Sequence, residues 1–210
     1  MLIHRRWFSV VGSLVLSTGA LLSGAAFAQA TEGPEVLIKR LSTEVLDSIR
    51  SDKSIQSGDT SRVIALVDSK IMPNVNFTRM TAAAVGRSWR QATPEQQKRL
   101  QEEFKTLLVR TYSGALAEVR DQTISMKPLR AAAEDTEVVV KSEIKGHGDP
   151  IQLDYRLEKA SNGWKIYDLN VLGVWLVETY RSQFAQEINA NGIDGLIGKL
   201  TERNKNAKKV

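Results

Sequence analysis

Hydrophobic residues in the first part of the chain recur every three or four positions, the spacing that places them on one face of a helix. Leu37, Leu41, Val45 and Ile49 form the first such set. The same spacing returns in three later stretches, each followed by polar or turn-forming residues. The pattern therefore predicts helices over residues 35–51, 63–71, 78–87 and 94–120.

The fourth predicted helix has the clearest start. Thr93 supplies an N-cap side chain, Pro94 occupies the first helical position and Gln96 follows three residues after the cap, which together form a capping box. Hydrophobic residues continue along one face from Leu100 to Val119. At 1.5 Å per residue the helix is about 39 Å long, so we expect it to cross the whole domain.

From Gln122 onward apolar residues alternate with polar ones, which is the two-residue period of a β-strand. Pro128 suits an edge strand, and Asn162-Gly163 is a favoured hairpin turn. Because helices precede and follow these strands, we expect an α+β fold whose antiparallel sheet has about four strands. The predicted strands cover residues 124–126, 136–144, 151–158 and 164–171.

Helical spacing returns after the last strand. It predicts a helix that begins near Val174 and ends at Gly192, where a glycine supplies a left-handed cap. A short helix over residues 193–200 follows. The polar, basic stretch 201–210 has no hydrophobic period, and we expect it to be a disordered tail.

The last predicted strand has apolar residues on both faces. By the strand period Trp164 and Ile166 point one way, whereas Tyr167, Leu169 and Val171 point the other way. A sheet with one face in water alternates more cleanly. Two interpretations stay open: a helix-covered sheet over a filled core, or a curved sheet whose concave side forms an apolar pocket.

The N-terminal residues have the three parts of an export signal. A basic start, His4-Arg5-Arg6, precedes an uncharged stretch over 7–31, and Ala26-Phe27-Ala28 has the small-x-small pattern of a cleavage site. We therefore expect residues 1–28 to be a cleaved signal peptide and residues 29–200 to form one domain. A retained membrane anchor is the alternative, because the uncharged stretch is long enough to span a bilayer.

Composition narrows the possible functions. Removing residues 1–28 with their two arginines leaves 182 residues and a formal charge of +3, which is too small to argue for nucleic-acid binding. The absence of cysteine excludes disulfides, thiolate catalysis and lipid attachment through an N-terminal cysteine. We expect the mature chain to be a soluble periplasmic protein.

Few residues suit catalysis. His147 is the one histidine beyond the signal and lies in a glycine-rich turn, and the sequence has no nucleophile elbow or phosphate-binding loop. Asp168 is the exception, because the strand period places it on the face of Trp164 and Ile166, where a buried carboxylate could act as a base. The favoured alternative is structural: Asp168 caps a helix or pairs with an arginine.

A basic cluster brackets the third predicted helix, at Arg79, Arg87 and Arg90. The simplest interpretation is a solvated basic surface. The functional interpretation is the mouth of a site that attracts a lipid phosphate or an acidic partner protein, because guanidinium groups bind such anions through paired hydrogen bonds. Both interpretations stay open at this stage.

Several short segments, each weak alone, recur together in an order that resembles the MlaC family of periplasmic phospholipid-binding proteins, also called the toluene-tolerance auxiliary family. The chain departs from the family pattern at Asn74-Val75-Asn76 and at Trp175, where a small residue is usual. The segments that carry the resemblance are Phe77–Thr81, Gly86, Trp89–Gln96, Leu108–Tyr112, Asp154–Leu157, Gly163–Asp168, Gly173-Val174, Tyr180–Phe184 and Gly192–Ile197.

The resemblance implies a curved sheet packed with helices around a deep apolar cavity that holds acyl chains. It implies a monomeric carrier, not an enzyme, with phospholipid as cargo and no cofactor. Such carriers move lipid between an outer-membrane lipoprotein–porin complex and an inner-membrane ABC transporter bearing a ring of substrate-binding subunits, and so maintain outer-membrane lipid asymmetry. The expected lipid-binding residues, some of which will be plain core, are Val85, Trp89, Phe104, Leu108, Tyr112, Val140, Leu153, Tyr155, Trp164, Ile166, Val174 and Phe184.

Physical chemistry supports the need for such a carrier. Exposing an acyl chain of about 15 methylenes to water costs about 12 kcal/mol, at about 0.8 kcal/mol for each methylene. A protein that encloses the chains removes this barrier without a covalent step. Two other functions remain: an α+β enzyme acting on a small apolar substrate with Asp168 as base, and a binding or chaperone-like module without lipid.

Overall fold

The computed structural model describes residues 32–146 and 148–206 of the chain. The expected signal peptide, residues 1–28, lies outside the described residues, and so does His147. The helices are α1 (Pro34–Ser51), α2 (Lys53–Gln56), α3 (Thr60–Leu66), the π-helix η1 (Val67–Ile71), the 3₁₀-helices η2 (Met72–Asn74) and η3 (Gly86–Gln91), α4 (Phe77–Val85), α5 (Pro94–Ala117) and α6 (Leu176–Asn206). The strands are β1 (Thr123–Met126), β2 (Glu137–Lys145), β3 (Ile151–Ala160), β4 (Gly163–Val171) and β5 (Val174–Trp175).

Local sequence signals place the helix ends. The capping box before α5 is present: the Gln96 backbone N–H donates to Thr93 Oγ1 at 3.2 Å, and the Thr93 N–H donates to Gln96 Oε1 at 3.0 Å. The helix ends at Ala117, slightly before the predicted end. The helix predicted over 63–71 is α-helical only as far as Leu66 and then widens into η1, a change that the hydrophobic spacing does not encode.

The sheet is antiparallel throughout, with its strands in the order β1-β2-β3-β4-β5, so each strand pairs with its neighbour in sequence. The four predicted strands are confirmed, but β5 was not predicted. Val174 therefore lies in a strand instead of starting a helix. The physical reason is the two-residue loop before it, in which Leu172 and Gly173 have φ values of 52° and 87° and turn the chain back onto β4.

The C-terminal helix is longer than predicted. It bends at Gly192, whose φ of 71° interrupts the helical backbone as the left-handed cap predicts. The segment beyond the bend continues to Asn206, so the expected disorder of residues 201–206 is wrong. Packing explains this, because buried Asn204 donates to the Glu103 backbone carbonyl oxygen at 2.9 Å and to its carboxylate at 2.7 Å. Residues 207–210 lie outside the described part.

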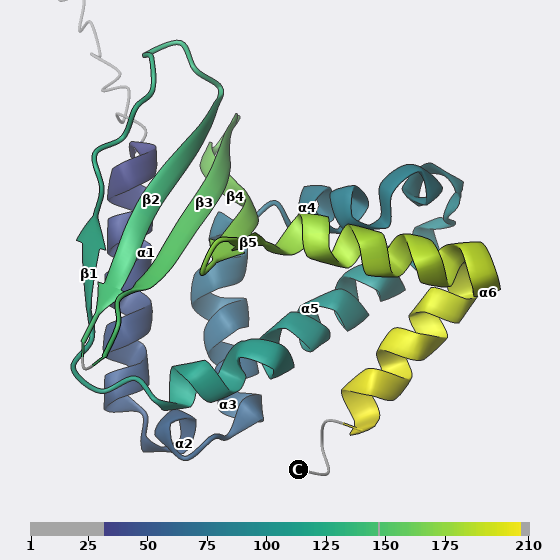
Figure 1. The fold of residues 1–210 in the computed structure, drawn as a ribbon, viewed down its shortest axis with the longest axis horizontal. Helices are drawn as coiled ribbons and strands as arrows, with labels where there is room; N and C mark the ends of the chain where they lie inside the picture. The colour runs from purple at the N-terminus through teal and green to yellow at the C-terminus, as the bar shows by residue number, and fades with distance from the viewer. Residues whose placement is uncertain (1–31, 147, 207–210) are drawn as a thin grey trace, which may run out of the picture. The chain divides into compact units, whose positions relative to one another are not determined.

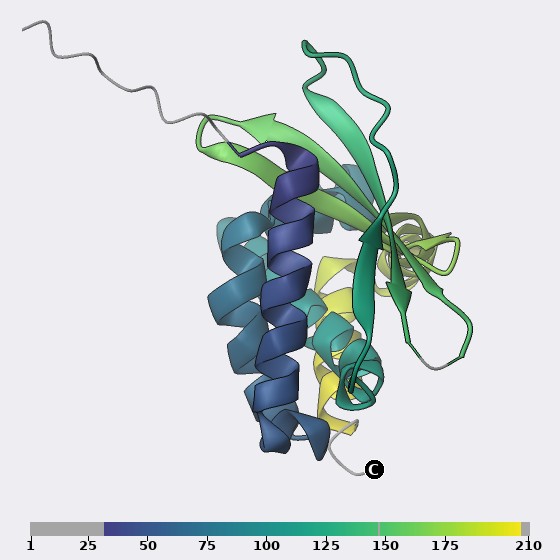
Figure 2. The same cartoon turned by 90° about the vertical axis from the view of Figure 1, so that its left-hand side faces the viewer.

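Helices cover one face of the sheet. We call this the inner face; it carries Val138, Val140 and Leu157, which form a buried cluster with Leu37, Ile38 and Leu41 of α1. Figure 2 shows α1 running along one side of the strands, and Figure 1 shows β2 and β3 from the other side with no helix in front of them. We call that side, which carries Glu137, Val139 and Lys141, the outer face.

A one-residue irregularity in β4 changes which side chains share a face. Arg156 pairs with Asp168, but the next residue, Leu157, pairs with Ile166, so Tyr167 is the extra residue of a β-bulge. The bulge shifts the strand period by one position. The strict alternation expected along the whole strand is therefore wrong.

The consequence is that β4 has one apolar face. Leu169 and Val171 lie on the inner face with Trp164 and Ile166, because Leu169 pairs with Tyr155 and Val171 with Leu153 on β3. Tyr167 points to the outer face, where its hydroxyl donates to Glu137 at 3.0 Å. The sequence predicted apolar residues on both faces of β4. Because the bulge shifts the alternation by one residue, these residues lie on the inner face, except Tyr167.

Candidate functional site

The inner face of the sheet is packed differently at its two ends. Near one end, Val138, Leu157 and Ile166 are at most 7% exposed and meet α1. Toward the other end, apart from the buried Ser142, the inward side chains are apolar but are not fully buried. These partly buried residues are Ile144, Leu153, Tyr155, Leu169 and Val171. This end of the sheet therefore presents apolar surface that no side chain covers completely.

A matching stripe lies on α5. Leu108, Tyr112 and Leu116 follow one another at four-residue spacing, and all three are partly buried. Leu108 and Tyr112 border the same hydrophobic cluster as Leu169 and Val171 of β4. Burial raises the pKa of the Tyr112 hydroxyl, and the nearby Tyr180 adds to this effect. The stripe and the open end of the sheet thus bring apolar side chains toward a shared region.

Tyr155 has the most informative environment. Burial raises the pKa of its hydroxyl, while the nearby side chains of Ser42 and Ser142 oppose the rise. Part of the side chain nevertheless remains accessible. Ser42 lies on α1 and Ser142 on β2, so a small polar group joins helix and sheet inside an apolar region.

In the described part of the chain, the buried hydrophobic residues form three clusters instead of one. The first surrounds α4, α5 and α6, the second lies between α1 and the sheet, and the third joins α1, α2, α3 and the C-terminal half of α5. Only partly buried residues are shared between them: Val75 borders the first and second, and Val45 borders the second and third. Packing is therefore dense within each cluster and less complete where they meet.

Ten of the twelve residues predicted to bind lipid are divided between two of these clusters. Val85, Trp89, Phe104, Leu108, Tyr112 and Phe184 lie in or against the first, and Val140, Tyr155, Trp164 and Ile166 in or against the second. Leu153 is partly buried on the inner face. Five of the twelve are at most 5% exposed and belong to the densely packed core: Val85, Phe104, Val140, Ile166 and Phe184.

One predicted residue is displaced and several candidates were missed. Val174 is 51% exposed on β5, so it does not lie in the interior. Leu169 and Val171 were assigned to the wrong face, and the linking positions Val45 and Val75 were not singled out. The bulge at Tyr167, which the alternation along β4 does not reveal, places Leu169 and Val171 on the inner face.

Asp168 is an anchor for the start of α6. It is 1% exposed, and its Oδ1 accepts backbone N–H bonds from Leu169 at 2.9 Å and Val177 at 3.1 Å. Its Oδ2 pairs with Arg156 at 2.9 Å, and that guanidinium lies 3.8 Å from the centre of the Trp175 ring. Burial raises the pKa of Asp168, and these N–H and guanidinium contacts oppose the rise. The favoured structural role, both capping a helix and pairing with an arginine, is confirmed.

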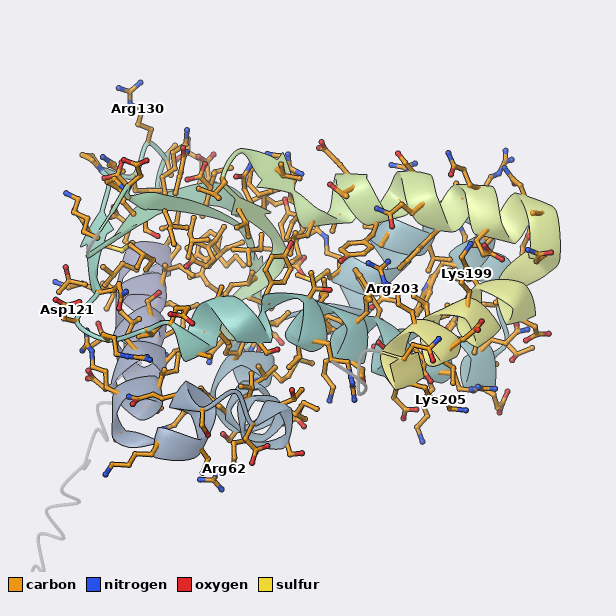
Figure 3. The ribbon with its side chains drawn as sticks, turned by 60° about the horizontal axis from the view of Figure 1, so that its bottom comes forward. Arg62, Asp121, Arg130, Lys199, Arg203 and Lys205 are labelled. Carbon is orange, nitrogen blue, oxygen red and sulfur yellow. The ribbon has the colours of Figure 1, made fainter. Side chains whose placement is uncertain are left out.

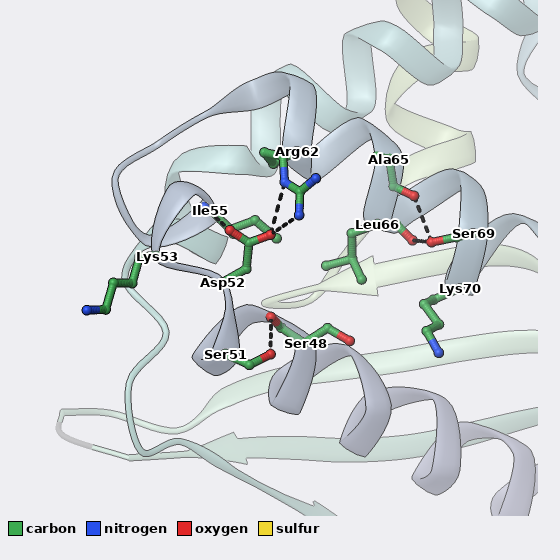
Figure 4. A pocket seen from close by; sticks show the side chains of 10 residues that line it. All are labelled: Ser48, Ser51, Asp52, Lys53, Ile55, Arg62, Ala65, Leu66, Ser69 and Lys70. Atoms are coloured by element: carbon green, nitrogen blue, oxygen red, sulfur yellow. Dashed lines mark hydrogen bonds and ion pairs between the residues drawn. The ribbon is translucent and has the colours of Figure 1, made fainter.

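The surface has an open cleft beside the end of α1 (Figure 4). It has a volume of about 740 Å³ and is lined mainly by polar residues of α1, α2, α3 and η1. Asp52 accepts from Arg62 across the cleft at 2.7 Å. Ser51 donates its hydroxyl hydrogen to the Ser48 carbonyl oxygen of α1, and Ser69 donates to the Ala65 carbonyl oxygen of α3. The charged side chains that line this cleft do not suit an acyl chain.

The basic residues near α4 are divided by the structure. Arg79 is engaged on the outer face, where it pairs with Glu137 at 2.7 Å and with Glu158, and stacks 3.6 Å from the Tyr167 ring centre. Arg87 and Arg90 are exposed. In the described part of the chain, no cluster of three or more His, Cys, Asp or Glu side chains could hold a metal ion. None of the helices in residues 32–146 and 148–206 is long and apolar enough to span a membrane.

Comparison with known proteins agrees with this architecture. The family model of the MlaC protein matches residues 39–202. The chain is 27% identical over 198 residues to the toluene tolerance protein ttg2D of Pseudomonas putida, covering 90% of this chain and 92% of the relative. It is 24% identical over 202 residues to the intermembrane phospholipid transport system binding protein MlaC of Haemophilus influenzae, covering 94% and 92%.

A solved structure shares the fold. The phospholipid-binding protein from Ralstonia solanacearum, determined in complex with a phospholipid, is 49% identical and superposes with a TM-score of 0.83. The match covers 85% of this chain and all of the other. The sheet with helices on its inner face is thus a known arrangement for this group of sequences. Because the family model covers most of the chain, this protein belongs to the MlaC family.

Proposed function

We propose that this protein binds a phospholipid and carries it through the periplasm, with the acyl chains held between the inner face of the sheet and the stripe on α5. The observation that carries the proposal is Tyr155, a side chain enclosed by protein that keeps accessible surface. We infer that this side chain borders the space in which the cargo would lie. The partly buried residues around it are apolar, as a hydrocarbon tail requires.

The separation of the hydrophobic clusters supports the same proposal. A domain of this size ordinarily has one contiguous core, because apolar side chains gain most by packing together. Here three clusters meet only through partly buried residues such as Val45 and Val75. A guest hydrocarbon chain between them would complete the packing that the side chains leave incomplete, at about 0.8 kcal/mol for each methylene removed from water.

The relatives supply the biological setting of the proposal. One is named as a binding protein of an intermembrane phospholipid transport system, and the Ralstonia protein was solved with a phospholipid bound. We infer the same cargo class for this chain. Its partners would be an inner-membrane ABC transporter complex and an outer-membrane lipoprotein–porin complex, and its traffic would maintain outer-membrane lipid asymmetry.

Mass spectrometry of solvent extracts from the native protein tests the proposal. We expect about one phospholipid for each folded chain. Leu153→Glu places a carboxylate on the inner face and should remove most of the lipid, whereas the control Val36→Glu, at a position 59% exposed on α1, should retain it. An empty wild-type protein, or a folded Leu153→Glu variant with a full lipid load, would show that the interior does not hold the cargo.

A further inference from the structure

The outer face of the sheet has a groove of its own. Its volume is about 670 Å³, within the range of ligand and peptide sites. It lies where the segment after β1 passes beside β2, on the side of the sheet that faces the viewer in Figure 1. Its lining comes from four connected parts of the chain, namely Lys127, Pro128, Arg130, Glu137, Val138, Val139, Lys141, Arg156 and Tyr167.

The groove is positively charged. Its lining contains four cations, Lys127, Arg130, Lys141 and Arg156, and one anion, Glu137. That anion is already bound, since Arg79 pairs with Glu137 at 2.7 Å and the Tyr167 hydroxyl donates to it at 3.0 Å; these contacts lower the pKa of Glu137. The carboxylate therefore stays ionised without neutralising the other cations of the groove.

Two of the four cations have no counter-ion among the described residues. Lys127 pairs with Glu143 at 2.8 Å and Arg156 with Asp168 at 2.9 Å. Arg130 and Lys141 form no ion pair with any residue that the structure describes, and both are exposed. Figure 3 shows Arg130 pointing away from the ribbon into solvent.

An apolar floor lies between these cations. Val139 is 40% exposed and stands two residues before Lys141 on the same face of β2. Pro128 and the Tyr167 ring add apolar surface beside it. Asp154, opposite Lys141 in the β2–β3 register, is 5% exposed and does not line the groove. The groove thus combines unpaired positive charge at its sides with the exposed apolar side chain of Val139.

We propose that this groove docks an acidic segment of a partner protein, with carboxylates on Arg130 and Lys141 and an apolar side chain over Val139. Charge complementarity identifies the occupant, because the two cations that have no ion-pair partner among the described residues flank Val139, which is 40% exposed. A recessed site with a fixed apolar floor fits a short peptide segment better than a flat membrane surface. The inference rests on the proposed function in one respect: a carrier must dock on the complexes that give and receive its cargo.

Fluorescence anisotropy tests this surface on the lipid-loaded protein. The probe is a labelled acidic peptide in which a leucine lies between two pairs of glutamates. We expect saturable binding that weakens between 50 and 300 mM salt, roughly the range over which surface charges become screened. The double variant Arg130→Glu, Lys141→Glu should bind about tenfold more weakly. The control Lys53→Glu, Lys70→Glu reverses two lysines in the other cleft and should bind like the wild type.

Two results would overturn the proposal. One is unchanged peptide affinity in the Arg130→Glu, Lys141→Glu variant. The other is that the wild-type protein does not bind the peptide but binds vesicles that contain phosphatidylglycerol, and that the variant does not bind these vesicles. This result would make the groove a membrane contact. Phospholipid content, measured on the same samples, reports on the cargo separately. An empty protein that binds the peptide would refute the carrier function and leave the docking surface standing.

Discussion

One pair of variants, at Phe104 and Leu108, can distinguish residues of the densely packed core from residues of the proposed lipid site. Phe104 is fully buried on α5 and contacts three other rings, with centroid distances of 5.8 Å to Phe77, 5.0 Å to Tyr180 and 5.2 Å to Phe184. Leu108, one turn later on the same helix, is only partly buried. We predict that Phe104→Leu weakens the fold and spares the cargo, whereas Leu108→Gln does the reverse.

The size of the first effect follows from the contacts. Phe104→Leu removes three carbons, a transfer loss of about 2.4 kcal/mol at about 0.8 kcal/mol each. The lost ring–ring contacts add about 1 kcal/mol or more. The free energy of unfolding should therefore fall by about 3–4 kcal/mol. For a domain of this length the expected drop in Tm is about 6–16 °C.

Leu108→Gln keeps the side-chain length and adds a polar end. Because Leu108 borders the region where packing is incomplete, we expect the free energy of unfolding to change by about 1 kcal/mol or less once cargo is removed. The amide would face hydrocarbon without a hydrogen-bond partner, a cost of about 1–3 kcal/mol that opposes lipid binding. Bound phospholipid should therefore fall several-fold.

The assay combines chemical denaturation of delipidated protein with mass spectrometry of lipid extracts from the native protein. Both variants are compared with the wild type at a temperature where circular dichroism shows each of them folded. The reasoning is refuted if Phe104→Leu unfolds like the wild type, or if the folded Phe104→Leu protein loses its lipid while Leu108→Gln retains a full load.

Three further predictions concern stability. Asp168→Asn should lower the free energy of unfolding by about 2 kcal/mol, because it leaves Arg156 without its buried partner, and urea denaturation measures the loss. Leu172→Asn should raise Tm by about 2–4 °C, since a left-handed leucine costs about 1 kcal/mol and Asn-Gly favours this turn; an unchanged Tm in calorimetry contradicts it. Arg79→Gln should cost about 1 kcal/mol at pH 7. Because Arg79 lowers the pKa of Glu137 from 4.5, this stabilisation is present above pH 4.5 and is lost as pH falls through the lowered pKa, so acid titration of both proteins should converge.

Regular elements with strong local signals could be predicted from the sequence. The capping box at Thr93 fixed the start of α5, and alternation located β2, β3 and β4. What failed depends on distant contacts. Residues 201–206 are polar and have no helical period of their own, yet they remain helical because Asn204 and Thr201 reach Glu103 on α5, almost a hundred residues earlier.

The candidate site was predictable in kind but not in detail. Composition cannot separate a residue that lines a space from one that fills the core, because both are apolar. Phe104 and Leu108 illustrate this: they share a helix face in sequence, but one is fully buried and the other is not. The difference arises from what faces each residue, and only the fold determines that.

The bulge at Tyr167 explains how one strand can serve both faces of the sheet. Without the extra residue, Leu169 and Val171 would point outward and Asp168 inward, placing an ionised group among the apolar side chains at a cost of several kcal/mol. With it, Leu169 and Val171 join the apolar inner face, while Asp168 holds the start of α6 and Tyr167 helps to form the basic groove. The irregularity therefore positions, within a few residues, part of the proposed lipid site, the anchor of the last helix and a wall of the proposed docking surface.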